Sequence, residues 1–282
     1  MITIQNNDLT LKINPLGGEW TSIVDANHQE HLFQGHHASW SRQAPLLFPI
    51  VGRLLDHQYH YQNQTFEMGQ HGFLRDMTLE VVSIEPTSVV LKTQANDATR
   101  RQYPFDFEVL ITYELEATEI KTTLEVINRG DKSMYYGIGG HPAFIINPLD
   151  DNYLEIEGDE LGEFILDGPY VRDYQPLTTK KFLLKEVDLV ATKIISQAPQ
   201  VRLVTPTKTI TLKMDPTKYI GIWAPFNSEN NRVEDCVALE PWWGMADCID
   251  HNKQLVEKKA IMSLEPQQSQ QFKFSINIQT IV

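Results

Sequence analysis

The feature that most constrains this sequence is an alternation of apolar and polar residues with a period of two. Near the C-terminus, "QFKFSINIQ" places Phe272, Phe274, Ile276 and Ile278 on one face. Because successive side chains of a β-strand point to opposite faces, this pattern is typical of a strand with one buried face. "EIKTTLEV" and "TITLKMD" alternate in the same way, and few segments keep apolar residues at helical spacing.

The expected strands come in pairs that are separated by short polar turns. Such pairs occupy 78–94, with Pro86 in the turn, 107–128 and 201–214. Sequential pairing predicts an all-β protein, either a large antiparallel sandwich or a barrel. Residues 157–190 are richer in glycine, proline and charge, and we expect loops and short hairpins over one edge there. No linker or repeat divides the chain, so we expect a single domain over 1–282.

Composition restricts the partners and the compartment. The chain has 282 residues, 41% of them apolar, and a net charge of −13. Such a surface repels a phosphate backbone on average, so we expect no nucleic-acid partner. No apolar run approaches the roughly 18–20 residues that cross a bilayer, and no signal peptide is apparent. We therefore expect a cytoplasmic protein without a membrane partner; the sequence does not indicate its oligomeric state.

Two polar residues interrupt apolar or glycine-rich runs in the first third of the chain. Arg53 follows the apolar stretch "APLLFPIVG" and needs a partner, because a lone buried charge is costly. Its partner is either a core carboxylate or the oxygen atoms of a ligand. His71 lies in "GQHGFLRD", where flanking glycines allow a sharp turn; it is either an ordinary loop histidine or a ligand contact.

Two further residues are of the types that transfer protons. His141, in "GIGGHPAF", precedes Pro142, which favours an extended and stiff backbone at the histidine. An imidazole titrates near neutral pH and can serve as an acid or a base. Glu240, in "ALEPWWG", lies beside Trp242 and Trp243, and partial desolvation there would raise its basicity. Each residue also has an ordinary structural interpretation when taken alone.

Other motifs do not support a cofactor. "HQEHLFQGHH" brings His28, His31, His36 and His37 close together, but the spacing matches no standard zinc pattern and the two cysteines do not complete one. We interpret this stretch as a surface loop and expect no metal. Neither a G-x-G-x-x-G dinucleotide motif nor a G-x-S-x-G hydrolase elbow is present.

In this order, "GGEWTSI", "PLLFPIVGRL", "HGFLRD", "GGHPAF" and "ALEPWWGMAD" resemble the aldose 1-epimerase (galactose mutarotase) family, and most of all its LacX-like branch. The resemblance runs along most of the chain. It implies the galactose mutarotase-like supersandwich, a large antiparallel β-sandwich with a sugar site in a cleft on one sheet. It also implies a small-molecule sugar as substrate, with no metal or organic cofactor.

The resemblance implies a role for each candidate residue. His141 matches the general acid and Glu240 the general base of anomer interconversion. His71 and Arg53 match sugar-binding residues, and Asp215 and Trp223 are further candidates for substrate contacts. Gly52 stands where the better-known branch of the family has asparagine, so the identity of the sugar is open. We expect the acid and the base to lie several ångströms apart, without a bond between them.

Three alternatives remain open at this stage. A mutarotase for a hexose 6-phosphate would need extra cations, which Arg53, Arg75 and a lysine not yet placed could supply. A non-catalytic sugar-binding module would keep the cleft without turnover. A glycosidase or lyase is less well supported, because a glycosidase typically uses two carboxylates and this chain pairs one carboxylate with a histidine.

Overall fold

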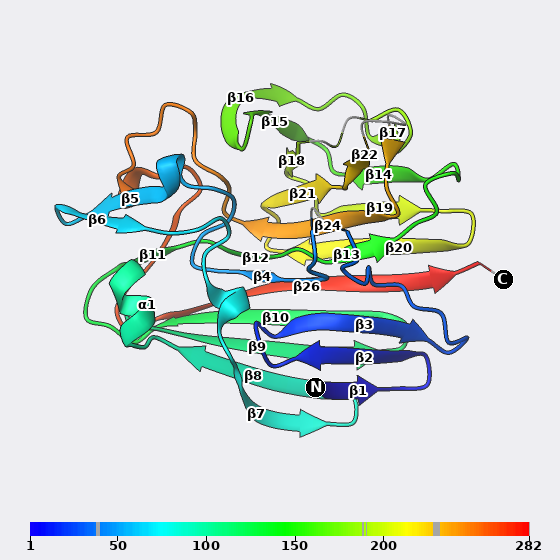
Figure 1. Cartoon of the computed structure of the whole chain (residues 1–282), viewed down its shortest axis with the longest axis horizontal. Helices are drawn as coiled ribbons and strands as arrows, with labels where there is room; N and C mark the ends of the chain where they lie inside the picture. The colour runs from blue at the N-terminus through cyan, green and yellow to red at the C-terminus, as the bar shows by residue number, and fades with distance from the viewer. Residues whose placement is uncertain (38–39, 188, 190, 228–231, 282) are drawn as a thin grey trace.

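The computed structural model describes residues 1–37, 40–187, 189, 191–227 and 232–281. Within these residues the chain forms stacked β-sheets, and every pair of neighbouring strands in them is antiparallel (Figure 1). The helical elements are the short α-helix α1 (Asp97–Gln102) and three 3-10 turns, at Leu55–His57, Leu74–Asp76 and Leu255–Glu257. The prediction of an all-β, large antiparallel sandwich is confirmed.

One layer is a nine-stranded sheet. Its strands, in spatial order, are β17 (Lys181–Leu183), β14 (Tyr153–Glu157), β19 (Gln200–Val204), β20 (Lys208–Asp215), β26 (Ser269–Thr280), β10 (Glu119–Asn128), β9 (Phe107–Glu116), β8 (Ser88–Gln94) and β7 (Glu80–Glu85). The three predicted hairpins are β7–β8, β9–β10 and β19–β20. The four alternating apolar side chains of β26 are all buried, as their period predicts.

The other layer consists of an eight-stranded and a three-stranded sheet. The larger contains β16 (Tyr170–Pro176), β15 (Gly162–Asp167), β18 (Lys193–Ser196), β21 (Tyr219–Trp223), β24 (Cys236–Trp243), β12 (Ile138–Gly140) and β4 (Leu46–Leu47), with β13 (Ala143–Ile145) also paired to β24. The smaller contains β1 (Ile2–Gln5), β2 (Leu9–Asn14) and β3 (Glu19–Asp25). The stretch 157–190 contains the hairpin β15–β16 and supplies edge strands to both large sheets, β16 to one and β17 to the other, and not to one edge alone as expected.

Three two-stranded ribbons complete the fold. They are β5 (Gln58–Tyr61) with β6 (Gln64–Glu67), β11 (Met134–Tyr136) with β25 (Met262–Leu264), and β22 (Phe226–Asn227) with β23 (Arg232–Val233). None of the helices among the described residues is long and apolar enough to span a bilayer.

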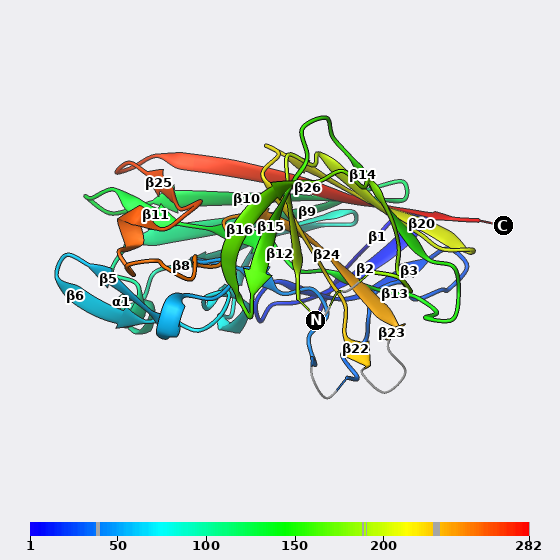
Figure 2. The same ribbon diagram turned by 90° about the horizontal axis from the view of Figure 1, so that it is seen from above.

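Figure 2 shows the ribbon of the two layers from above. Aromatic side chains join the layers. Trp20 of β3 packs against Tyr113 of β9 with ring centroids 5.5 Å apart. Trp243 of β24 packs against Phe272 of β26 at 5.1 Å. Because side chains alternate along a strand, Trp243 faces the core and its neighbour Trp242 faces away from the nine-stranded sheet. The outer face of β24 is therefore the face that carries Glu240 and Trp242.

A buried ion pair fixes the segment that follows β24. Lys258 Nζ lies 2.7 Å from Asp247 Oδ1 and also donates to the Met245 carbonyl at 2.7 Å. The side chains of Lys258 and Asp247 are only 3% and 1% exposed. Asp247 in turn accepts from the Leu55 amide, and its own amide donates to the Arg53 carbonyl. The ion pair thus ties the end of β24 to the backbone that presents Arg53.

We expect Lys258→Met to lower the free energy of unfolding by about 3–5 kcal/mol, because it leaves the Asp247 carboxylate buried without its cation. Chemical denaturation of the purified variant measures this loss. Lys185→Met is the control, since Lys185 pairs with Asp151 on the surface and is exposed; its stability should be nearly unchanged. Equal stability of Lys258→Met and Lys185→Met would contradict the importance of the buried pair.

Candidate active site

His141 and Glu240 are cross-strand neighbours on the outer face of the eight-stranded sheet. Strand β24 pairs with β13 through Ala238 and Ala143, and with β12 through Trp242 and Gly139. The same register continues across the gap between β12 and β13, which brings Glu240 opposite His141. The backbone there is held by the Leu239 amide, which donates to the Pro142 carbonyl at 3.0 Å. Directly opposed side chains on adjacent strands come into contact, so the register itself creates the pair.

The two side chains touch. His141 Nε2 lies 3.1 Å from Glu240 Oε2, although the two groups are not aligned for a hydrogen bond. The expectation that they stand several ångströms apart is therefore wrong, because sequence motifs do not reveal that both residues occupy one rung of the sheet. Glu240 is fully buried and His141 is 8% exposed.

Burial sets the protonation of both groups. Loss of water raises the pKa of the Glu240 carboxyl well above its ordinary 4.5. Burial, with a smaller contribution from the Arg75 charge, lowers the pKa of the His141 imidazole from 6.5 to about 4. Desolvation disfavours the charged form of each group. Burial thus favours the uncharged form of both groups, a neutral imidazole and a protonated carboxyl group.

A cavity of 660 Å³ opens in front of His141. This size lies within the range of about 300–1,000 Å³ that is usual for small-molecule sites. Among the described residues, its walls come from the following groups: Trp40, Pro45, Gly52, Arg53, Gln70, His71, Arg75, His141, Leu166, Gly168, Pro169, Ala191, Thr192, Ile194, Trp223, Trp242 and Ala246. Glu240 is not part of this wall but lies directly behind His141.

His71 is placed by a strained turn. The backbone φ of His71 is +66°, and that of the next residue, Gly72, is +69°. A Cβ atom at Gly72 would lie only 2.3 Å from the Phe48 carbonyl oxygen, so only glycine fits there. The Gly52 amide donates to His71 Nδ1 at 3.1 Å. Burial, followed by the charges of His141, Arg75 and Arg53, lowers the pKa of His71 well below 6.5. His71 is therefore a neutral imidazole whose Nδ1 is already engaged.

Gln70 holds two guanidinium groups at the cavity. Arg53 Nη2 donates to the Gln70 side-chain oxygen at 2.8 Å, and Arg75 Nη2 donates to the Gln70 carbonyl at 2.8 Å. Arg75 also lies 3.9 Å from Asp76. For Arg53, no ion pair with a carboxylate occurs among the described residues. Of its two sequence-based interpretations, the structural ion pair is thus not supported.

Aromatic rings form the other side of the cavity. Trp40 and Trp223 lie 5.1 and 5.9 Å from the His141 ring, measured between centroids. Trp242 lies 6.0 Å from His71. Trp223, which the sequence suggested as a substrate contact, is therefore beside His141. Of the two indoles that follow Glu240 in sequence, only Trp242 shares its face of the strand.

Unpaired polar atoms concentrate at this site. Within the described part of the chain, ten buried side-chain nitrogen or oxygen atoms make no hydrogen bond. Six of them belong here: both carboxylate oxygens of Glu240, His141 Nδ1, Trp242 Nε1, and the Nε atoms of Arg53 and Arg75. Buried polar groups are normally satisfied, and exceptions concentrate where function requires them. The arrangement is suited to a ligand that is rich in hydroxyl groups.

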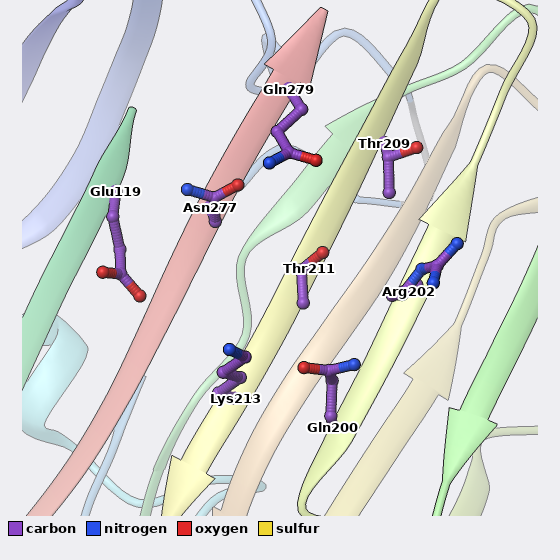
Figure 3. A pocket seen from close by; sticks show the side chains of 8 residues that line it. All are labelled: Glu119, Gln200, Arg202, Thr209, Thr211, Lys213, Asn277 and Gln279. Atoms are coloured by element: carbon purple, nitrogen blue, oxygen red, sulfur yellow. The ribbon is translucent and has the colours of Figure 1, made fainter. Parts of the chain in front are cut away.

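Asp215 lies elsewhere. It ends β20, where alternation buries Met214 and turns Asp215 to solvent beside Lys273 of β26. Asp215 lines a hollow on the outer face of the nine-stranded sheet and is not among the residues around His141. The neighbouring hollow of 420 Å³ on that face is shown in Figure 3; it carries amides, hydroxyls and charges from β10, β19, β20 and β26, with no imidazole or indole. Its chemistry does not suit proton transfer.

The sequence did not single out several wall residues. Trp40 comes from a loop without a motif, and Gln70 stands directly before His71, so only its place beside that histidine could have drawn attention to it. Leu166 comes from β15, in the stretch 157–190 where we expected loops and short hairpins, and Ile194 comes from β18, for which the sequence offered no motif. The structure brings together His141, Glu240, His71, Arg53 and Trp223 from five separate segments.

Comparison with known proteins finds relatives that match nearly the whole chain. Protein LacX of Lactococcus lactis subsp. lactis is 26% identical over 300 residues, covering 98% of this chain and 99% of LacX. Among solved structures, a galactose mutarotase related enzyme from Lactobacillus acidophilus matches with a TM-score of 0.92 and 28% identity, over 99% of this chain and 97% of that one. A galactose mutarotase-like protein from Lactobacillus casei ATCC 334 matches with a TM-score of 0.92 and 26% identity, over 99% and 100%.

A model of the family described as aldose 1-epimerase matches residues 1–276, nearly the whole chain. The chain belongs to the aldose 1-epimerase family.

Proposed function

We propose that this protein interconverts the α and β anomers of a hexose, with His141 and Glu240 as the proton-transfer pair. The observation that supports the proposal is the pair itself: an imidazole and a carboxyl group in contact, both desolvated, with the imidazole lining a cavity around which buried polar atoms lack partners. Trp40 and Trp223 offer apolar faces to the C–H face of a sugar ring, and His71 and Arg53 offer donors to its oxygens.

The proposed reaction uses the pair without net consumption of protons. Movement of the Glu240 carboxyl proton to His141 gives an imidazolium and a carboxylate. Glu240 then accepts the proton of the anomeric hydroxyl while the bond between C1 and the ring oxygen breaks, and His141 protonates that oxygen. The open aldehyde rotates about its C1–C2 bond, and the reverse steps close the other anomer. Because Glu240 lies behind His141, the sugar must separate the two side chains to reach the carboxylate.

We expect Glu240→Gln and His141→Ala each to reduce the rate of mutarotation by roughly 10²–10⁴-fold, the usual contribution of a positioned proton-transfer group. Polarimetry of freshly dissolved α-galactose and α-glucose measures the rate. Glu119→Gln, on the outer face of the other sheet, is the control and should leave the rate unchanged. Full activity of Glu240→Gln would refute the role of the carboxylate. If the wild-type protein binds sugar but does not accelerate mutarotation, it is a non-catalytic sugar-binding module.

The pH dependence follows from the two shifts. The pair works while it holds one proton. It gains a second proton when His141 titrates, at about pH 4 instead of 6.5, and loses its proton only above the raised pKa of Glu240. We therefore expect kcat/KM, corrected for buffer catalysis, to fall in acid near pH 4 and to stay level from there up to the raised pKa of Glu240. A decline centred near pH 6.5 would show that the imidazole is not desolvated as described.

A phosphorylated hexose is a second candidate substrate, favoured by one observation. Arg53 and Arg75 both line the cavity, whereas no aspartate or glutamate does so among the described residues. Planar guanidinium groups bind phosphate oxygens well. The wall of this cavity is thus cationic even though the protein as a whole is acidic.

Comparison of glucose with glucose 6-phosphate tests this second candidate. If the arginines bind the phosphate, KM for the phosphorylated sugar is lower, and Arg75→Gln raises that KM by roughly tenfold or more with little effect on glucose. Arg202→Gln removes a guanidinium from the hollow of Figure 3 and serves as the matched control. Equal KM values for the two sugars in the wild-type protein would exclude the phosphate as a recognised group.

A further inference from the structure

A cluster of metal-binding residue types lies outside the proposed active site. His36 Nε2 lies 2.8 Å from Asp235 Oδ2, and His37 Nε2 lies 2.6 Å from Asp235 Oδ1. One ligand atom from each of the three residues can be chosen so that all lie within 4.8 Å of one another. Two imidazole nitrogens from one loop thus converge on a carboxylate that is almost two hundred residues away in sequence.

This arrangement alters the interpretation of the histidine-rich stretch "HQEHLFQGHH" as an ordinary surface loop. His31 belongs to a separate buried network, where its ring lies 3.1 Å from Asp25 and 3.4 Å from Lys208 Nζ. His28 is exposed at a turn. His36 and His37 alone share a carboxylate, and that carboxylate comes from the segment just before β24. The spacing of the histidines could not reveal a ligand so far along the chain.

The surroundings match those of a metal ligand set. His37 Nδ1 lies 2.6 Å from Glu234 Oε2, so the ring nitrogen opposite Asp235 already has a carboxylate partner. Metal-binding histidines characteristically donate their second N–H to such an outer carboxylate, which fixes the ring and its tautomer. The His36 side chain is 56% exposed and the Asp235 side chain 36%, so a cation can enter from solvent.

We propose that His36, His37 and Asp235 form a binding site for a zinc-like divalent cation, with Glu234 as the outer partner of His37. Two imidazoles and one carboxylate suit zinc and neighbouring transition metals, whereas magnesium and calcium prefer oxygen ligands. Tetrahedral zinc, with bonds of about 2.0–2.1 Å, holds its ligand atoms about 3.3 Å apart. The two nitrogen–oxygen contacts of 2.6 and 2.8 Å, which go to different oxygens of Asp235, would have to open slightly, and the set of three ligand atoms, now within 4.8 Å of one another, would have to draw together around the ion.

The site is connected to the cavity by stacked rings. His37 stacks on Phe33 with centroids 5.2 Å apart, and Phe33 stacks on Trp40 at 5.6 Å. Trp40 in turn lies 5.1 Å from His141, and its amide donates to the His37 carbonyl at 3.2 Å. A cation held between this loop and Asp235 would anchor the loop that supplies Trp40 to the cavity wall. The cation would thus be structural and would not act on the sugar.

Cobalt and zinc titrations of the metal-free full-length protein test the proposal. Cobalt reports its coordination through its visible absorption, and zinc binding is followed by calorimetry and by the thermal midpoint. We expect one equivalent to bind, zinc to displace cobalt, and zinc to raise the midpoint of unfolding, because a ligand that binds the folded state stabilises it. Magnesium should produce none of these effects.

Variants assign the binding to the three residues. His36→Gln and Asp235→Asn should each weaken zinc binding by at least about tenfold, and Glu234→Ala should weaken it by about 10–100-fold. Because His36 is half exposed, its variant should fold normally, which near-ultraviolet circular dichroism checks. His28→Asn is the matched control and should bind zinc like the wild type. No stoichiometric binding, or binding that survives both His36→Gln and Asp235→Asn, would overturn the proposal.

Discussion

The central constraint in this structure is a carboxyl group and an imidazole held on one rung of a buried sheet. Glu240 belongs to β24, a strand whose eight residues are all buried, and His141 faces it from the gap between two short strands. Desolvation disfavours the charged form of both groups: it raises the pKa of Glu240 and lowers the pKa of His141. The sheet thus holds an acid and a base together in a desolvated contact, and this pair is the basis of the proposed chemistry.

The sheet and the loops have different tasks. The proton-transfer pair lies on strands whose register fixes its geometry, which suits groups that must be positioned closely. The rest of the cavity wall comes mainly from loops: Trp40, Arg53, Gln70 and Arg75 lie between β3 and β7. Loops can change without disturbing the sheet, so the identity of the sugar is expected to depend on them. The buried Lys258–Asp247 pair holds the backbone at Arg53. The proposed cation site would hold the loop that supplies Trp40.

Much of the fold could be predicted from the sequence, because alternation with a period of two is a local property. The hairpins β7–β8, β9–β10 and β19–β20 and the buried face of β26 followed from it. The stretches around Arg53, His71, His141 and Glu240 could also be identified, since each places a polar residue in an apolar or glycine-rich run. Contacts between distant segments could not be predicted from the sequence. The direct contact of His141 with Glu240 depends on strand register, Asp215 faces solvent because of its parity along β20, and Asp235 approaches His36 and His37 only in the folded chain.

The most direct test of the account is the mutarotation rate of the double variant His141→Ala/Glu240→Gln compared with both single variants. If the two residues act as one proton-transfer unit, removal of the second residue lowers the mutarotation rate only slightly once the first has been removed. The double variant should then be about as slow as the slower single variant. Losses that multiply in the double variant would show that the two groups act independently, which would contradict one proton-transfer unit as the basis of this site.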